Sequence, residues 1–228
     1  MQFPNQNWVA PIYFILLVIV IAAGGNDLFW AAAIAKGLLM PLLMVYFWLN
    51  VRPRTDAFVR FMLVALGFSW LGDLLMLFQD QAIFFVLGLG SFLAAHIAYI
   101  GVFTRKQEGK KTVGLVGRNF LWAAPIMIYG FGLYLWLYPN LNGMMVPVCL
   151  YAVAICGMLI AAVNRQTFVS YLSFRYVLLG ALLFVVSDSM IALNMFDEPI
   201  NNASFWIMMT YGLGQWLIVT GVLWFNKN

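Results

Sequence analysis

Residues 58–78 read FVRFMLVALGFSWLGDLLMLF, an apolar run with one basic residue near its start, Arg60, and one acid near its end, Asp73. A helix of this length spans about 30 Å, which is the thickness of the hydrocarbon core of a bilayer. Hydrophobic residues make up 64% of the 228 positions and charged residues only 9%, too few to cover a water-facing surface. The sequence therefore predicts an all-α, polytopic integral membrane protein.

Eight apolar runs are long enough to cross a membrane. We expect transmembrane helices at about 8–24, 27–49, 58–78, 82–103, 119–138, 144–163, 173–196 and 203–225, within one domain over residues 1–228. The breaks between them carry turn residues, as in Gly24-Gly25-Asn26-Asp27 and Asp197-Glu198-Pro199. Residues 1–7 contain no Lys or Arg, so we interpret the first run as a retained helix rather than a cleaved signal peptide.

The distribution of Lys and Arg predicts the orientation. If eight helices alternate, all basic residues except Lys36 fall on the side of the two termini, and none falls on the other side. These residues are Arg52, Arg54, Arg60, Arg105, Lys106, Lys110, Lys111, Arg118, Arg165, Arg175 and Lys227. We therefore expect both termini to be cytoplasmic, at the inner membrane if the source is bacterial. Because this charge is scattered over short loops, we expect no nucleic-acid partner.

Two short sequence similarities suggest an internal repeat, an echo between the first four and the last four apolar runs. Gly72-Asp73 in the third run resembles Ser187-Asp188 in the seventh, and Gly88-Leu89-Gly90 resembles Gly212-Leu213-Gly214. Such an echo would suit two parallel four-helix halves, although chance similarity between apolar helices is common.

Ionisable residues inside spanning helices are costly and are therefore candidates for function. Asp73 follows Arg60 by thirteen residues, and Asp188 follows Arg175 by thirteen, so we expect both acids at one depth, about 20 Å from those arginines. Two carboxyls facing one cavity would favour one protonated acid beside one carboxylate, the pairing that acid/base catalysis uses. The alternative is that each acid is neutralised separately or bonded to a neighbouring helix.

Lys36 is the third charged residue expected within the membrane. Pro41 has no amide hydrogen, so the carbonyl of Gly37 loses its donor within the helix. A freed carbonyl beside an ammonium group indicates a polar cavity. The alternative is a lysine whose side chain extends to the outer surface of the membrane.

Other polar residues of the spanning runs are further candidates for lining a site. His96 and Tyr99 share a helix face, as do Tyr211 and Gln215, and Tyr151 lies in the middle of its run. Each of them also fits a purely structural role in bonding between helices. The chain has one His and two Cys, Cys149 and Cys156, so we expect no metal site and no cofactor.

Taken in order along the chain, these residues resemble the YhhN-like family, whose members include lysoplasmalogenases. The resemblance rests on Lys36 with Pro41, Gly72-Asp73-Leu74-Leu75, Phe92-Leu93-Ala94-Ala95-His96-Ile97-Ala98-Tyr99, Tyr151, Gly180-Ala181 with Phe184, Ser187-Asp188-Ser189, and Tyr211 with Gln215. Each fragment is weak alone, but the ordered set covers almost the whole chain.

The resemblance implies hydrolysis of the vinyl-ether bond of a lysoplasmalogen, or a related ether lysolipid, to a fatty aldehyde and a glycerophospho-base. It also implies that Asp73 and Asp188 are the catalytic acids and that Lys36, His96, Tyr99, Tyr151, Ser187, Tyr211 and Gln215 contact substrate. The partner is then a lysophospholipid of the membrane.

Two other classes of function stay open at this point. Buried Asp, Lys and His residues also serve as proton relays in proton-coupled transporters of small molecules or lipids. A chain of this size would be small for a transporter unless it forms a homodimer. A structural membrane protein without chemistry would leave two acids at matched depth unexplained.

The orientation can be tested by cysteine labelling of intact cells. In a background without the native cysteines, Glu108→Cys should resist a membrane-impermeant maleimide, whereas Asn142→Cys should react, because the two positions are expected on opposite sides. Permeabilised cells, in which both positions should react, are the control. Labelling of position 108 without permeabilisation would contradict the predicted orientation.

Overall fold

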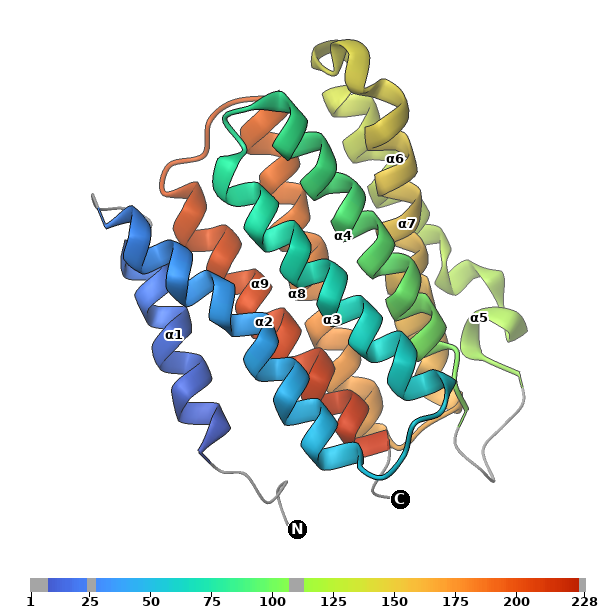
Figure 1. Cartoon of the computed structure of the whole chain (residues 1–228). Coiled ribbons are helices and arrows are strands. Elements are labelled where there is room, and N and C mark those ends of the chain that lie inside the picture. Colours follow the sequence, from blue (N-terminus) through green and yellow to red (C-terminus); the bar gives the residue numbers. More distant parts are fainter. Residues whose placement is uncertain (1–7, 24–27, 107–112, 226–228) are drawn as a thin grey trace. The chain divides into compact units, whose positions relative to one another are not determined.

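The computed structural model describes residues 8–23, 28–106 and 113–225, which are mainly helical and contain no β-strand (Figure 1). Six of the described helical segments are long and apolar enough to cross a membrane. They are α2 (Phe29–Val51), α3 (Ala57–Leu75) with its 3-10 extension to Phe78, α4 (Ala82–Phe103), α7 (Met145–Asn164) with its flanking turns, α8 (Tyr171–Phe196) and α9 (Ala203–Phe225). The predicted all-α, polytopic membrane class is confirmed.

The two other expected helices are shorter than predicted. The first is α1 (Val9–Ala23), with 15 residues, and the fifth is α6 (Ala124–Leu137), with 14. The predicted run 119–138 was wrong at its start, where the chain instead forms the short α5 (Leu115–Arg118) and a 3-10 turn at Phe120–Trp122. The Asn119 side chain accepts a hydrogen bond from the Leu121 amide at 3.0 Å, which favours a turn there, and Pro125 favours a new helix start. The expected turn at 24–27 lies outside the described residues.

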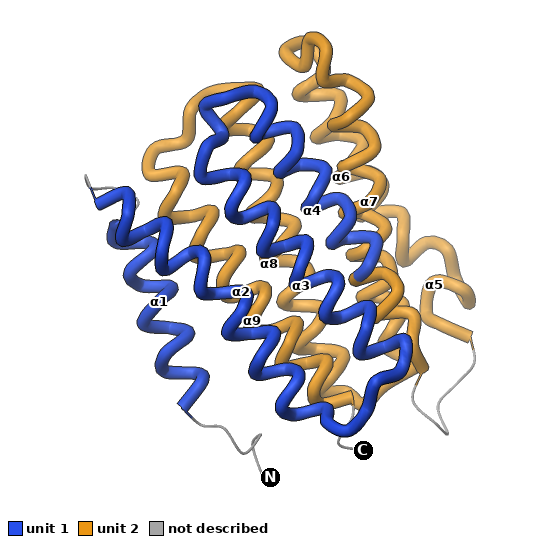
Figure 2. The backbone as a smooth tube through the Cα atoms, viewed as in Figure 1, with its two compact units in different colours: residues 1–98 blue, residues 99–228 orange. Residues whose placement is uncertain are grey.

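The chain divides into two compact units, residues 1–98 and 99–228 (Figure 2). In the first unit, α1 packs on α2 and α2 packs on α3. The hydroxyl of Ser91 on α4 donates to the Phe68 carbonyl on α3 at 2.7 Å. Close by, the Phe92 ring occupies the space that a Cβ atom at Gly72 would need, only 2.8 Å away. The missing side chain of Gly72 thus lets α4 approach α3 next to Asp73.

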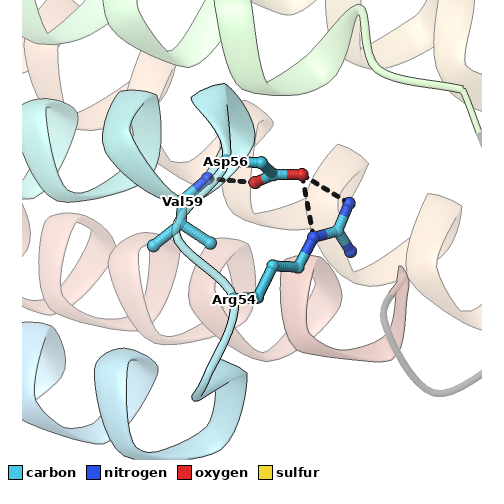
Figure 3. Close-up of polar contacts among 3 residues, drawn as sticks. All are labelled: Arg54, Asp56 and Val59. Atoms are coloured by element: carbon cyan, nitrogen blue, oxygen red, sulfur yellow. Dashed lines mark hydrogen bonds and ion pairs between the residues drawn. The ribbon is translucent and has the colours of Figure 1, made fainter.

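The start of α3 is fixed by a local cap (Figure 3). Asp56 accepts a hydrogen bond from the Val59 amide at 3.2 Å through Oδ1, which supplies an acceptor for one of the unpaired amides of the first turn. Its Oδ2 atom lies 2.8 Å from Arg54 Nε and 2.7 Å from Arg54 Nη2. This exposed pair adds little stability by itself, but it holds the carboxylate in the capping position.

In the second unit, α8 and α9 approach each other more closely than ordinary side chains would allow. A Cβ atom at Gly180 on α8 would lie 2.7 Å from the Gly214 carbonyl oxygen on α9. A Cβ atom at Gly221 would lie 2.8 Å from the Val177 amide nitrogen. Contacts of this length bring backbone against backbone, which is a common mode of helix packing in membranes.

Two serines extend this close contact at both ends. The hydroxyl of Ser173 donates to the Gly221 carbonyl at 2.6 Å, and that of Ser187 donates to the Ile207 carbonyl at 3.2 Å. Ser173, Gly180 and Ser187 are spaced seven residues apart, as are their partners on α9. A seven-residue repeat keeps one face of each helix turned toward the other along the whole contact.

Arg165, which the sequence placed in a cytoplasmic loop, is fully buried at the end of α7. Its guanidinium donates to the Ser173 hydroxyl at 2.9 Å and to the Val102 carbonyl at 3.5 Å. It also lies 5.8 Å from the ring centre of Phe103 and 5.6 Å from that of Phe225. A planar guanidinium can stack on rings while it donates hydrogen bonds in its own plane, so this arginine fits inside the unit.

The glycine contact makes a prediction about stability. Gly180→Ala should lower the thermal midpoint of the detergent-purified protein, because the added methyl group meets the α9 backbone, and overpacking of this kind costs about 1–3 kcal/mol. The matched control is Gly132→Ala on α6, where no atom lies within 4 Å of the added Cβ. The control should leave the midpoint unchanged or raise it, since Ala favours a helix over Gly. Equal midpoints for both variants would contradict the close contact.

Candidate functional site

In the first unit, the site is built around Asp73, near the end of α3. Its side chain is only 2% exposed, and the Lys36 ammonium on α2 lies 3.8 Å from its Oδ1 atom. This distance is that of an ion pair rather than of a direct hydrogen bond. Because a buried carboxylate is costly without an opposite charge, the lysine gives Asp73 a specific partner. Lys36 thus points to α3 and does not extend to the membrane surface.

The carbonyl that Pro41 frees is engaged by a residue that the sequence did not single out. Trp70 on α3 donates its indole N–H to the Gly37 carbonyl at 2.8 Å. Trp70 precedes Asp73 by three residues and Gly37 follows Lys36, so the hydrogen bond and the ion pair lie side by side between α2 and α3. The two contacts together fix the position of Lys36 against Asp73.

In the second unit, the site is built around Asp188 on α8, whose side chain is also buried. The hydroxyl of Tyr151 on α7 donates a hydrogen bond to its Oδ2 atom. Both residues line a cavity of about 50 Å³ between α6, α7 and α8. Tyr129 and Ser189, joined by a 2.7 Å hydrogen bond, line the same cavity. The cavity is large enough to hold water, which needs about 10–15 Å³, and the side chains of Tyr151, Asp188 and Ser189 are among those that line it.

A second polar pair of this unit lies beside Phe184, which precedes Asp188 by one helical turn on α8. The hydroxyl of Tyr99 donates to Gln215 Oε1 on α9 at 2.5 Å. The ring of Phe184 meets the rings of Tyr99 and Tyr211 edge-on, with ring centres 6.3 Å and 5.4 Å apart. Since Phe184 precedes Asp188 by four residues, this aromatic cluster and the acid share a face of α8.

The predicted site residues fall in both units. Lys36, Asp73 and the fully buried His96 belong to the first, and Tyr99, Tyr151, Ser187, Asp188, Tyr211 and Gln215 belong to the second. The structure brings Lys36 to Asp73, Tyr151 to Asp188, and Tyr99 to Gln215. The hydroxyl of Ser187 donates to the Ile207 carbonyl and so links α8 to α9. The pairing of Asp73 with Asp188 stays a prediction.

Sequence reasoning missed three residues of this geometry: Trp70, Tyr129 and Ser189. For Trp70, its place one turn before Asp73 on a helix was an available signal. Ser189 is adjacent to Asp188 in the sequence, but its hydroxyl also bonds the Val185 carbonyl, as Ser does in many helices. No sequence pattern pointed to Tyr129, since its part in the cavity depends on how α6 packs on α8.

Comparison with known proteins agrees with the resemblance noted in the sequence. The model of the YhhN family matches residues 31–222, which include both aspartates. The chain belongs to the YhhN family. No solved structure matches this family member.

Curated relatives of this YhhN-family chain come from mammals and bacteria. It is 36% identical over 160 residues to "Lysoplasmalogenase TMEM86A" of Bos taurus, a match covering 68% of the chain and 62% of that relative. It is 28% identical to "Lysoplasmalogenase" of Mycobacterium bovis, with 71% and 60% covered. It is 28% identical to "Lysoplasmalogenase TMEM86B" of Sus scrofa, with 95% and 86% covered. The chain thus spans about three fifths of the length of the first two relatives.

The contact between α2 and α3 can be tested with a double-mutant cycle. Trp70→Phe should destabilise the protein by about 1–3 kcal/mol, because it leaves the Gly37 carbonyl without a donor. In a Pro41→Ala background, the restored amide at position 41 can bond that carbonyl, so the same Trp70→Phe change should cost much less. Thermal midpoints of the four purified proteins measure the coupling. Equal losses in both backgrounds would show that the indole hydrogen bond does not replace the helical one.

Proposed function

We propose that this protein is a lysoplasmalogenase-like hydrolase that cleaves the vinyl-ether bond of a lysoplasmalogen or a related ether lysolipid. The observation that carries the proposal is the buried carboxyl of Asp188, hydrogen-bonded to Tyr151 at a cavity large enough for water. The names of the curated relatives support it. A buried acid beside a cavity that can hold water is the minimum that an acid-catalysed hydrolysis needs.

The reaction needs one proton delivered and one water added. A proton goes to the alkenyl carbon remote from the ether oxygen, which leaves an oxocarbenium-like cation at the other carbon. Water adds to that carbon and loses its proton, giving a hemiacetal. The hemiacetal collapses to a fatty aldehyde and the free hydroxyl of the glycerophospho-base, so the two products together contain the lipid and one water.

We assign the two acids different roles. The Lys36 ammonium near Asp73 stabilises the ionised form of that carboxyl. Asp188 accepts a hydrogen bond from the neutral hydroxyl of Tyr151. We therefore propose that Asp188 gives the proton and that the Asp73 carboxylate stabilises the cation and orients water. This division of roles requires the two acids to serve one substrate.

The remaining polar residues are proposed to position the lipid. The hydrogen-bonded side chains of Tyr99 and Gln215 lie beside Phe184 and can offer donors and acceptors to the glycerol end. We propose that His96, Ser187 and Tyr211 act in the same part of the site. The termini are proposed to be cytoplasmic, as the distribution of Lys and Arg predicts.

Substitution of the acids tests the catalytic proposal. Asp73→Asn and Asp188→Asn should each lower aldehyde release from lysoplasmalogen by about 10²–10⁴-fold, the usual loss when a positioned acid or base is removed. Because the two act as a unit, the double variant should be little worse than either single one. The assay is release of free aldehyde by purified protein in detergent, and Asp56→Asn at the exposed α3 cap is a matched control that should retain activity.

Two results would contradict the proposal. The first is wild-type protein that releases no aldehyde from any vinyl-ether lysolipid, although it is folded in detergent. The second is both Asn variants keeping more than about a tenth of the wild-type rate. A proton-coupled transporter would give the first result and would instead show uptake into vesicles that depends on the same two acids.

A further inference from the structure

A groove between α6 and α7 lies on the opposite side of their contact from the Asp188 cavity. Its volume is about 370 Å³, and its lining is almost entirely apolar. The main lining side chains are Met127 and Phe131 on α6 and Val153 and Ile160 on α7. Phe131 and Val153 are 64% and 67% exposed, so the groove opens to the surface of the protein. Since α7 is long and apolar enough to cross a membrane, its exposed surface at Val153 is expected to face hydrocarbon.

The groove and the Asp188 cavity share part of their walls. Gly130, Tyr134, Ala152 and Cys156 line both. These four shared residues, called the seam below, lie between the apolar groove and the cavity beside Asp188.

Within the seam, Cys156 on α7 packs directly against Gly130 on α6. Cys156 reaches from α7 to α6, where its thiol lies 3.7 Å from the Ile126 carbonyl. It can do so because residue 130 is glycine, since a Cβ atom there would lie 2.3 Å from Cys156 Sγ. The Cys156 thiol thus fills the space beside Gly130 within the seam, and rotation about χ1 of Cys156 would move the thiol out of that space.

We propose that the α6–α7 groove binds the hydrocarbon chain of a single-chain lipid and that the reacting end of this lipid reaches Asp188 through the seam at Gly130 and Cys156. The identity of the lipid rests on the proposed function. An apolar groove that is open at the protein surface and shares a wall with the cavity of a buried carboxyl matches a molecule with one apolar chain and one polar end. Its volume is at the lower end of the range for small-molecule sites, which suits part of one chain rather than two.

The test uses a saturated 1-O-alkyl lysophospholipid, which has no vinyl ether to hydrolyse, with a photoreactive diazirine near the end of its chain. Irradiated with the purified full-length protein, this probe should label α6 and α7 at the groove residues, as mapped by mass spectrometry. Val153→Trp, which narrows the groove from its open side, should lower that labelling at least about fivefold. Ala152→Leu fills the shared wall and should do the same.

The matched control is Leu150→Trp, a lipid-facing position of α7 that is 58% exposed and does not line the groove. It should leave the labelling unchanged. Labelling spread evenly over all lipid-facing helices, or unaffected by both Val153→Trp and Ala152→Leu, would overturn the proposal.

Hydrolysis measured beside labelling separates this proposal from the proposed function. With long-chain and short-chain lysoplasmalogens, Val153→Trp should lower the rate mainly for the long chain, and Leu150→Trp should not. Groove labelling by wild-type protein that hydrolyses no vinyl ether would support the chain site and contradict the enzymatic function. Hydrolysis of lysoplasmalogen without groove labelling and without a chain-length effect would support the enzymatic function and contradict the chain site.

Discussion

The second unit depends on the contact of α8 and α9 along a seven-residue repeat of small side chains. At its centre the backbones of Gly180 and Gly214 touch, and at its ends the hydroxyls of Ser173 and Ser187 bond carbonyls of α9. Within a bilayer, helices gain little from burying apolar surface, because lipid tails are equally apolar, so close packing and hydrogen bonds must hold them together. This contact fixes the rotation of α8, and with it the direction in which Asp188 points.

Each of the two buried acids contacts a residue on a helix that packs beside its own. Asp73 has a cation, Lys36, and Asp188 has a neutral hydroxyl, Tyr151. This difference is chemical and not only geometric, because a cation favours a carboxylate whereas a phenol can serve either protonation state. The two acids thus differ in the chemistry of these contacts, which is the difference on which the proposed division of roles rests.

Much of the fold and part of the candidate site were predictable from the sequence. The features that sequence reasoning missed have physical causes. The long apolar runs predict the spanning helices because hydrocarbon thickness sets their length, and two runs, 82–103 and 203–225, match α4 and α9 to the residue. The start of α6 was missed because Asn119 and Pro125 act locally, within an otherwise apolar stretch. Pro41 predicted the freed Gly37 carbonyl, but the choice of Trp70 as its donor depends on how α3 packs on α2. Tertiary packing, which no single run encodes, also decided the burial of Arg165.

The buried position of Arg165 has a consequence for how the chain is made. The guanidinium contacts Val102 and Phe103 from α4, Ser173 from α8 and Phe225 from the end of α9. The ribosome adds Phe225 sixty residues after Arg165, so during synthesis the guanidinium must wait in water or among lipid headgroups until the last helix arrives. Enclosing it is thus a late event of biogenesis. A chain whose synthesis stops before Phe225 therefore keeps this guanidinium uncovered on the side of that ring.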